Sequence, residues 1–165
     1  MPYLSPGKVF NLKPTNLMNI KRCLLSFLAV WLFIFLFEWV FHGILLQDLY
    51  AQAGDLLRPP AEMQRRFHFL VLGHGVMALG VVWLVARLGA GSKAVEGAKV
   101  GLCVAVIGIG INLVTYAVQP FSSKLVAIWC VGAFIEFGVA GLIAAAIYRP
   151  APGTVVASPL ATAGS

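Results

Sequence analysis

Long apolar runs alternate with short charged stretches along this chain. Four runs stand out, at residues 23–46, 67–85, 100–118 and 125–148. A helix needs about 20 apolar residues to cross the roughly 30 Å of hydrocarbon in a bilayer, and each run has about that length. The pattern therefore predicts an all-α membrane protein built as a bundle of four transmembrane helices.

The first apolar run follows Lys21 and Arg22, an arrangement that also opens a secretory signal peptide. However, it is much longer than the apolar part of such a peptide, which has about 7–15 residues. It also carries Glu38 and His42. We therefore expect an uncleaved first span.

The stretches between and beyond the runs have the composition of loops and tails. After the first run, apolar residues recur at helical spacing as far as Leu57, and Pro59 and Pro60 then stop the pattern. This predicts a short helix lying flat at the membrane interface in the first outer loop. We expect an irregular cytoplasmic tail at residues 1–22, the transmembrane domain at 23–148, and a flexible or partner-bound tail at 149–165.

Composition agrees with a lipid environment. Hydrophobic residues make up 60% of the chain and charged residues 11%, whereas soluble domains have about 45–50% and 25%. So little polar surface indicates that the lipid bilayer surrounds most of the chain. No catalytic signature stands out, so we expect no enzyme.

The distribution of Lys and Arg predicts the orientation of the spans, because cytoplasmic loops carry an excess of both. The two tails and the connection between the second and third runs hold eight of these residues: Lys8, Lys13, Lys21, Arg22, Arg87, Lys93, Lys99 and Arg149. The first and third connections hold four: Arg58, Arg65, Arg66 and Lys124. This places both termini in the cytoplasm. The net charge of +6 then suits anionic lipid head groups, and we expect no nucleic-acid partner.

Small residues line the last three spans, while the first span is bulky. Helices in lipid approach one another through glycine and alanine, so we expect helix packing at Gly73, Gly80, Gly101, Gly108, Gly138 and Gly141. The first span carries large aromatic residues all round. We expect Trp31, Phe35 and Trp39 to face lipid or a partner protein.

Five polar residues lie within the outer halves of the spans and come from all four of them: Glu38, His42, His74, Asn112 and Glu136. An ionisable group inside a membrane is costly and raises a functional question. Glu38 and His42 are four residues apart, so they share one helix face. The five residues could form a structural network that satisfies its own hydrogen bonds, or a pathway for protons or ions.

Metal and haem binding are a further alternative at Glu38, His42, His74 and Glu136. Di-iron bundles need a Glu-x-x-His pair on each of two helices, whereas this chain has one Glu and one His four apart on a single helix. A haem needs two opposed histidines at similar depth, and those of His42 and His74 differ by about one helical turn. We therefore expect no cofactor and no metal.

Several segments of the chain carry a resemblance to known proteins: EWVFHGILL at 38–46 with LY at 49–50, EG at 96–97 with GL at 101–102, YAVQP at 116–120, Glu136, and YRP at 148–150. The resemblance is to a group of small, uncharacterised bacterial four-span membrane proteins, and it extends from about Leu24 to Pro150. It implies the four-span architecture and a bacterial inner membrane, and it implies no reaction.

Three functional hypotheses follow from these patterns. The first is a non-catalytic accessory subunit of a larger respiratory, photosynthetic or oxidising membrane complex, in contact with other membrane subunits. The second is a small transporter or a proton- or ion-conducting protein that uses Glu38, His42, His74 and Glu136. The third is a haem- or metal-binding membrane protein. Close packing around both carboxylates would remove the second hypothesis, because a charge in hydrocarbon needs solvation.

Overall fold

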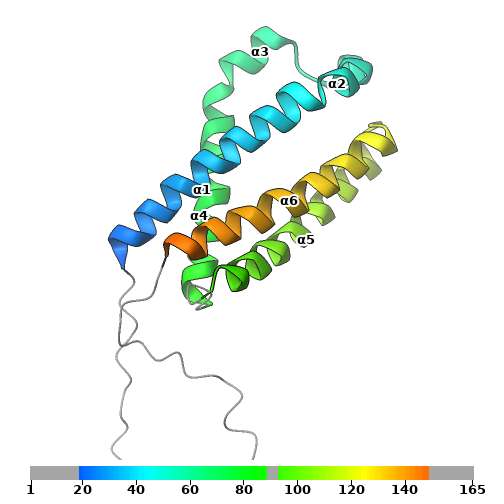
Figure 1. Ribbon diagram of the computed structural model, residues 1–165. Coiled ribbons are helices and arrows are strands. Elements are labelled where there is room, and N and C mark those ends of the chain that lie inside the picture. The colour runs from blue at the N-terminus through cyan, green and yellow to red at the C-terminus, as the bar shows by residue number, and fades with distance from the viewer. Residues whose placement is uncertain (1–18, 89–92, 149–165) are drawn as a thin grey trace, which may run out of the picture.

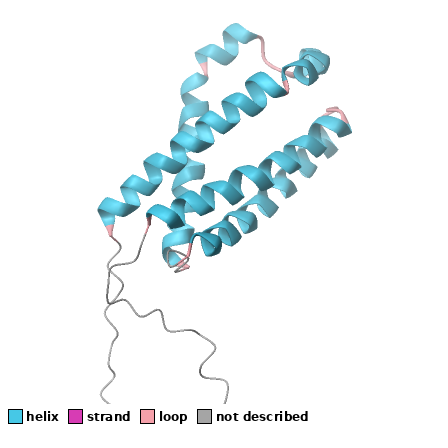
Figure 2. Ribbon diagram, viewed as in Figure 1, coloured by secondary structure: helices cyan, strands magenta, loops and turns pink. Residues whose placement is uncertain are grey.

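The computed structural model describes residues 19–88 and 93–148, and helices account for nearly all of them (Figure 2). Four are long and apolar enough to cross a membrane, which confirms the predicted all-α architecture with four long apolar helices. Residues 89–92 of the second connection, residues 1–18 of the predicted N-terminal tail and the whole predicted C-terminal tail lie outside the described residues. The elements, in chain order, are α1 Ile20–Val40, a π-helical turn η1 Phe41–Leu45, α2 Gln47–Ala53, a 3₁₀ turn η2 Gly54–Leu56, α3 Pro60–Arg65, α4 Phe67–Arg87, α5 Ala94–Val118 and α6 Ser123–Ile147.

The third span begins at Ala94, one and a half turns before the predicted boundary at Val100. The helix extends past the apolar run because its first turns carry a charged pair of their own. Lys99 Nζ lies 2.9 Å from Glu96 Oε1, and both side chains are exposed. The first span begins slightly early as well, at Ile20, where the Asn19 side chain accepts a hydrogen bond from the Arg22 amide at 3.2 Å.

The four long helices place the start of α1, the end of α4, the start of α5 and the end of α6 at one end of the bundle (Figure 1). The short helices α2 and α3 and the turn between α5 and α6 lie at the other end, which we call the loop end. Both ends of the transmembrane domain therefore emerge on the same side, as an even number of spans requires.

α5 and α6 form the most extensive helix pair, and glycines let their backbones touch. A Cβ atom added to Gly101 would lie 1.9 Å from the Phe137 carbonyl oxygen, and one added to Gly97 would lie 2.2 Å from the Gly141 oxygen. Gly97 and Gly101 are four residues apart, the spacing at which small residues line one helix face. No side chain fits between the two backbones here.

Gly141 belongs to the same close contact, since an added Cβ there would lie 2.1 Å from the Gly97 oxygen. The four remaining glycines with an expected packing role fall into two groups. Gly108 and Gly138 have ordinary or tight side-chain contacts across the α5–α6 pair, to Phe137 and Leu102 respectively. The expectation is wrong for Gly73 and Gly80, where an added Cβ would meet no heavy atom within 4 Å. These two residues of α4 lie beside open space because α4 contacts α5 only sparingly.

α1 packs on α4 through residues that we expected to face lipid or a partner. The Trp31 indole N–H donates to the Val71 carbonyl at 3.2 Å, and the ring of Phe35 meets the His74 ring edge-on at 5.8 Å. The partner-facing expectation is therefore wrong for Trp31 and Phe35. Aromatic side chains surround the first span, so its sequence does not show which face is buried. The contact with α4 determines that face. Trp39 is 61% exposed and faces outward.

Two apolar clusters occupy opposite ends of the bundle. The larger one, toward the termini, joins α1, α4, α5 and α6, and it includes Val30, Ile34, Val81, Val85, Ala105 and Ala144, all fully or almost fully buried. The smaller one, at the loop end, is built on Leu46, Phe121, Leu125 and Val126. The polar residues of the spans lie between these clusters.

Candidate functional site

Glu38 and His42 sit where α1 changes into the π-helical turn η1. The Leu46 amide donates to the Phe41 carbonyl at 3.1 Å. Donor and acceptor are five residues apart, as in a π-helix, so the helix is wider at this point. Such single π turns occur often at functional sites because they re-aim side chains. Here His42 Nε2 lies 3.4 Å from Glu38 Oε2.

The other ring nitrogen of His42 is bonded to the outer loop. Nδ1 of His42 is hydrogen-bonded to the Tyr50 hydroxyl on α2, and the Trp129 indole N–H on α6 donates to the same hydroxyl at 2.8 Å. An indole can only donate, so the Tyr50 oxygen accepts from Trp129 and has its own proton to give to His42. In neutral His42 the remaining proton is then on Nε2, the atom that faces Glu38.

His74 approaches the same carboxylate from α4. Its Nε2 lies 4.0 Å from Glu38 Oε2, which is longer than a hydrogen bond. The residue is 7% exposed, and its Nδ1 has no hydrogen-bond partner among the described residues. His74 is thus held by packing against Phe35 more than by polar contacts.

Glu136 is the most deeply buried ionisable group of the site. It is 3% exposed, and its Oε1 has no hydrogen-bond partner in the part of the chain that the structure describes. Its side chain lines the same cavity as that of Glu38 on α1. A buried carboxyl oxygen without a partner is unusual, because most buried polar atoms are hydrogen-bonded.

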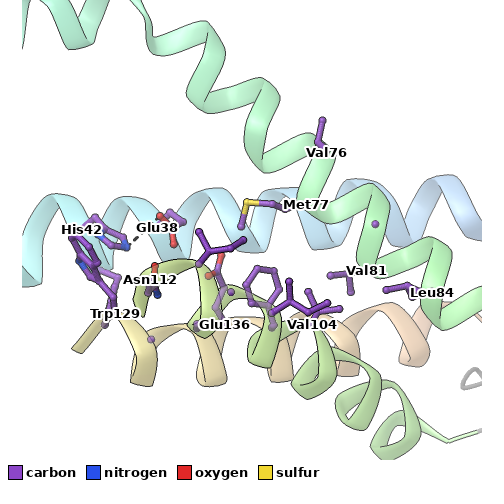
Figure 3. A pocket seen from close by; sticks show the side chains of 18 of the residues that line it. Glu38, His42, Val76, Met77, Val81, Leu84, Val104, Asn112, Trp129 and Glu136 are labelled. Carbon is purple, nitrogen blue, oxygen red and sulfur yellow. Dashed lines mark ion pairs between the residues drawn. The ribbon is translucent and has the colours of Figure 1, made fainter. Parts of the chain in front are cut away.

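Both carboxyl groups line one cavity of about 580 Å³, the lateral groove, which lies among the four long helices (Figure 3). Glu38, His42, Asn112, Trp129 and Glu136 gather at its loop end. Its remaining walls are apolar and come mainly from α4 and α5: Val76, Met77, Gly80, Val81, Leu84, Val104, Ile107, Gly108 and Ile111. The groove is therefore a polar pocket continued by an apolar channel along the bundle.

A second cavity of about 740 Å³, the outer hollow, lies on the other side of Glu38. Its walls include Phe35, Trp39, Leu57, Met63, Phe67, Leu70, His74 and Phe121. Glu38, His42, Tyr50 and Trp129 line both cavities. These four residues thus form the partition between the lateral groove and the outer hollow.

The structure divides the five predicted site residues between the two cavities. Glu38 and His42 line both, Asn112 and Glu136 line the lateral groove, and His74 lines the outer hollow. Sequence reasoning missed Tyr50 and Trp129. The available signal was chemical: a half-buried tyrosine or tryptophan has a polar atom that needs a partner.

Tyr50 lies outside the spanning helices, on α2. The pKa of Tyr50 is raised to about 12, mainly by burial; the bond from Trp129 lowers the pKa, and the nearby Glu38 carboxylate contributes to the rise. Tyr50 therefore keeps its proton at neutral pH and can donate it to His42.

The arrangement joins groups that exchange protons: a hydroxyl, an imidazole and two carboxyls, from three helices. Within residues 19–88 and 93–148, no three His, Cys, Asp or Glu side chains converge as metal ligands do. Comparisons with family models, with curated proteins and with solved structures found no match for this chain.

Proposed function

We propose that this chain is a small proton-coupled transporter or proton-conducting protein of a bacterial inner membrane. The observation that carries the proposal is the lateral groove: the carboxyl groups of Glu38, which is 24% exposed, and of Glu136, which is 3% exposed, line one cavity. A carboxyl kept only for helix packing would be expected to have its hydrogen bonds satisfied. Glu136 Oε1 is unsatisfied within the described chain, at a place where a carboxyl is costly.

The hydrogen-bonded groups give the proton a route from the loop end. Tyr50 on α2 is bonded to His42, which faces Glu38, and Glu38 and Glu136 line the same groove. Each step joins groups that can gain or lose a proton or pass one on. The route runs from the outer loop to the middle of the bundle.

Beyond Glu136, toward the termini, the lateral groove is lined by apolar side chains such as Leu84 and Val104. Fully buried Val30 and Ile34 of α1 pack with Val81 and Ala144 at that end of the bundle. None of these side chains can hydrogen-bond, so none of them can pass a proton on. A proton that reaches Glu136 needs a movement of the helices, or returns the way it came. This favours a transporter over an open channel.

The proposal includes the orientation of the chain in the membrane and the side on which the loop end lies. The excess of Lys and Arg at the tails and the second connection favours cytoplasmic termini. The loop end, with α2 and α3, then lies on the periplasmic side. We place α2 flat at that interface, where its half-buried Tyr50 and Leu49 turn toward the bundle and Gln47 and Asp48 are directed to water.

Proton flux into liposomes tests the proposal. The purified protein is reconstituted, a potassium diffusion potential is imposed, and the internal pH is followed with a trapped dye. We expect flux above that of protein-free liposomes, and a loss of about tenfold or more in Glu136→Gln and Glu38→Gln, since each variant removes a titrating group. Glu62→Gln is the matched control: this carboxylate is exposed on α3, 3.0 Å from Arg66. Equal flux in Glu136→Gln and the wild type would contradict the proposal.

An accessory subunit is the second candidate, and one observation favours it. Trp39 is 61% exposed beside the outer hollow, a place where a partner helix would find an aromatic contact. Isolation from native membranes in mild detergent is the test. Co-purifying membrane subunits that Trp39→Ala releases would support it, and migration of the wild type as a free monomer would contradict it.

A further inference from the structure

We propose that the lateral groove binds an apolar organic molecule with a protonated amine, the amine lying between Glu38 and Glu136. This inference rests on the proposed function, because it names the substrate class of the same site. Four observations support it: the charge of the groove, the unpartnered Glu136 oxygen, the apolar wall and the route of entry.

The charge of the groove selects a cation. Glu38 and Glu136 both line it, and no lysine or arginine among the described residues does so. The nearest groups that can carry positive charge are His42 and His74, and each faces Glu38. Glu136 on α6 is left without a basic partner in the described chain. An ammonium group would supply both the charge and the hydrogen-bond donor that this carboxyl lacks.

The unpartnered oxygen of Glu136 is a second observation, and it does not depend on which charged groups line the groove. Glu136 is 97% buried, since 3% of its surface is exposed, and Oε1 reaches no donor in the described residues. Leaving a buried acceptor unsatisfied is costly. In Figure 3 the carboxyl group projects into the groove, on the same side as Glu38. This oxygen has almost no exposed surface, so a ligand amine in the groove meets it when the carboxyl group turns toward the ligand.

The rest of the groove suits an apolar body. Met77 and Leu84 of α4 face Val104 and Ile107 of α5 along it, and its volume of about 580 Å³ falls in the usual range for small-molecule sites, about 300–1,000 Å³. Gly80 widens the passage, because an added Cβ there would meet nothing within 4 Å. This is why Gly80 is not a packing residue.

Entry is from the lipid, between α4 and α5. These two helices make few contacts with each other, whereas α5 is held closely to α6. An amphipathic amine concentrates in the bilayer, with its apolar part in the acyl chains, and can move sideways into the groove. The free amine is favoured over an amine-bearing phospholipid because the groove has no lysine or arginine, among the described residues, to pair with a phosphate.

Three probes with one apolar body and different head groups test the inference: phenylbutylamine, phenylbutanol and phenylbutyrate. Their binding to the whole detergent-purified protein is measured by calorimetry against empty micelles. We expect the amine to bind about tenfold or more tighter than the alcohol or the acid, a difference of about 1.4 kcal/mol. Glu136→Gln should remove this preference, and Glu62→Gln should keep it. Displacement of the amine by a short-chain phosphatidylethanolamine that binds more tightly would overturn the free-amine assignment.

Two further variants keep the test sharp if Glu136→Gln does not fold. Glu136→Asp retains the charge and should retain the preference for the amine, while Gly80→Leu fills the groove and should abolish binding of all three probes. Alcohol binding equal to amine binding, or amine binding unchanged in Gly80→Leu, would overturn the inference. The binding assay uses no proton gradient, so its result is independent of the flux assay. Proton flux without amine binding would contradict the proposed ligand class alone. Amine binding without proton flux would contradict the proposed transport alone.

Discussion

The indole N–H of Trp129 donates a 2.8 Å hydrogen bond to the hydroxyl of Tyr50, and this bond ties α6 to the short helix α2. The same hydroxyl is bonded to Nδ1 of His42. Two residues at the loop end therefore set which nitrogen of His42 carries its proton, and with it the side that His42 presents to Glu38. The loop is part of the site as well as a connection between spans.

Removing the Tyr50 hydroxyl should weaken the fold at the loop end. Tyr50→Phe leaves the Trp129 N–H and the His42 Nδ1 without their shared partner. We expect the free energy of unfolding in detergent to fall by about 1–3 kcal/mol. Tyr116→Phe is the control, because its side chain is 44% exposed and should change stability little. Equal stability of Tyr50→Phe and the wild type would show that the bond contributes nothing.

Tyr50 also predicts a pH dependence at the alkaline end. Its pKa is raised from 10.0 to about 12 by burial, with Glu38 adding to the effect. A raised pKa means that the folded state prefers the protonated phenol. The associated stability is therefore present below pH 10 and is lost as the pH rises toward 12.

The tyrosinate absorbance of the wild type and Tyr50→Phe, titrated side by side, isolates this group. The difference between the two curves should rise with a midpoint near 12. A midpoint at or below 10.0 would show that Tyr50 is not enclosed as described.

Two Gly→Ala substitutions on α5 should have opposite effects. In Gly101→Ala the new Cβ would lie 1.9 Å from the Phe137 carbonyl, so α5 and α6 must move apart. We expect a loss of about 1–3 kcal/mol, as for other overpacked sites. In Gly110→Ala the Cβ meets nothing within 4 Å, and alanine favours the helix by about 0.5–1 kcal/mol. Unfolding of both variants by a denaturing detergent measures the pair, and equal losses would contradict the close α5–α6 contact.

A leucine in place of Glu136 should stabilise the protein and inactivate it. The substitution removes a buried acceptor that lacks a partner in the described chain, so we expect the free energy of unfolding to rise by about 1–3 kcal/mol. Proton flux should fall to the level of protein-free liposomes. Thermal unfolding and flux on one preparation provide both readouts. A destabilised Glu136→Leu would indicate that this carboxyl supports the fold instead.

Much of the architecture could be predicted from the apolar runs, because span length is set by the thickness of the bilayer. The helix ends were harder to predict. The start at Ala94 depends on Glu96 and Lys99 pairing along the helix surface, and hydropathy treats both residues as loop. The buried face of the first span was not predictable either. Its aromatic residues surround the helix, and only the position of α4 turns Trp31 and Phe35 inward.

The polar residues of the candidate site could be identified from their place within apolar runs, but not their division between two cavities. That division depends on the angle at which α4 leaves the bundle and on the position of His42 in the π-helical turn η1. Tyr50 and Trp129 were missed because they are ordinary residues at a membrane boundary. Their bond joins positions 79 residues apart, and no local pattern predicts it.

A double-mutant cycle of proton flux tests most directly whether Glu38 and Glu136 act together in one cavity. Flux is measured in Glu38→Gln, in Glu136→Gln and in the variant with both changes. Groups that act as a unit are strongly non-additive, so the double variant should lose no more flux than the more severe single variant. Losses that multiply, or single variants with the flux of the wild type, would contradict a shared site.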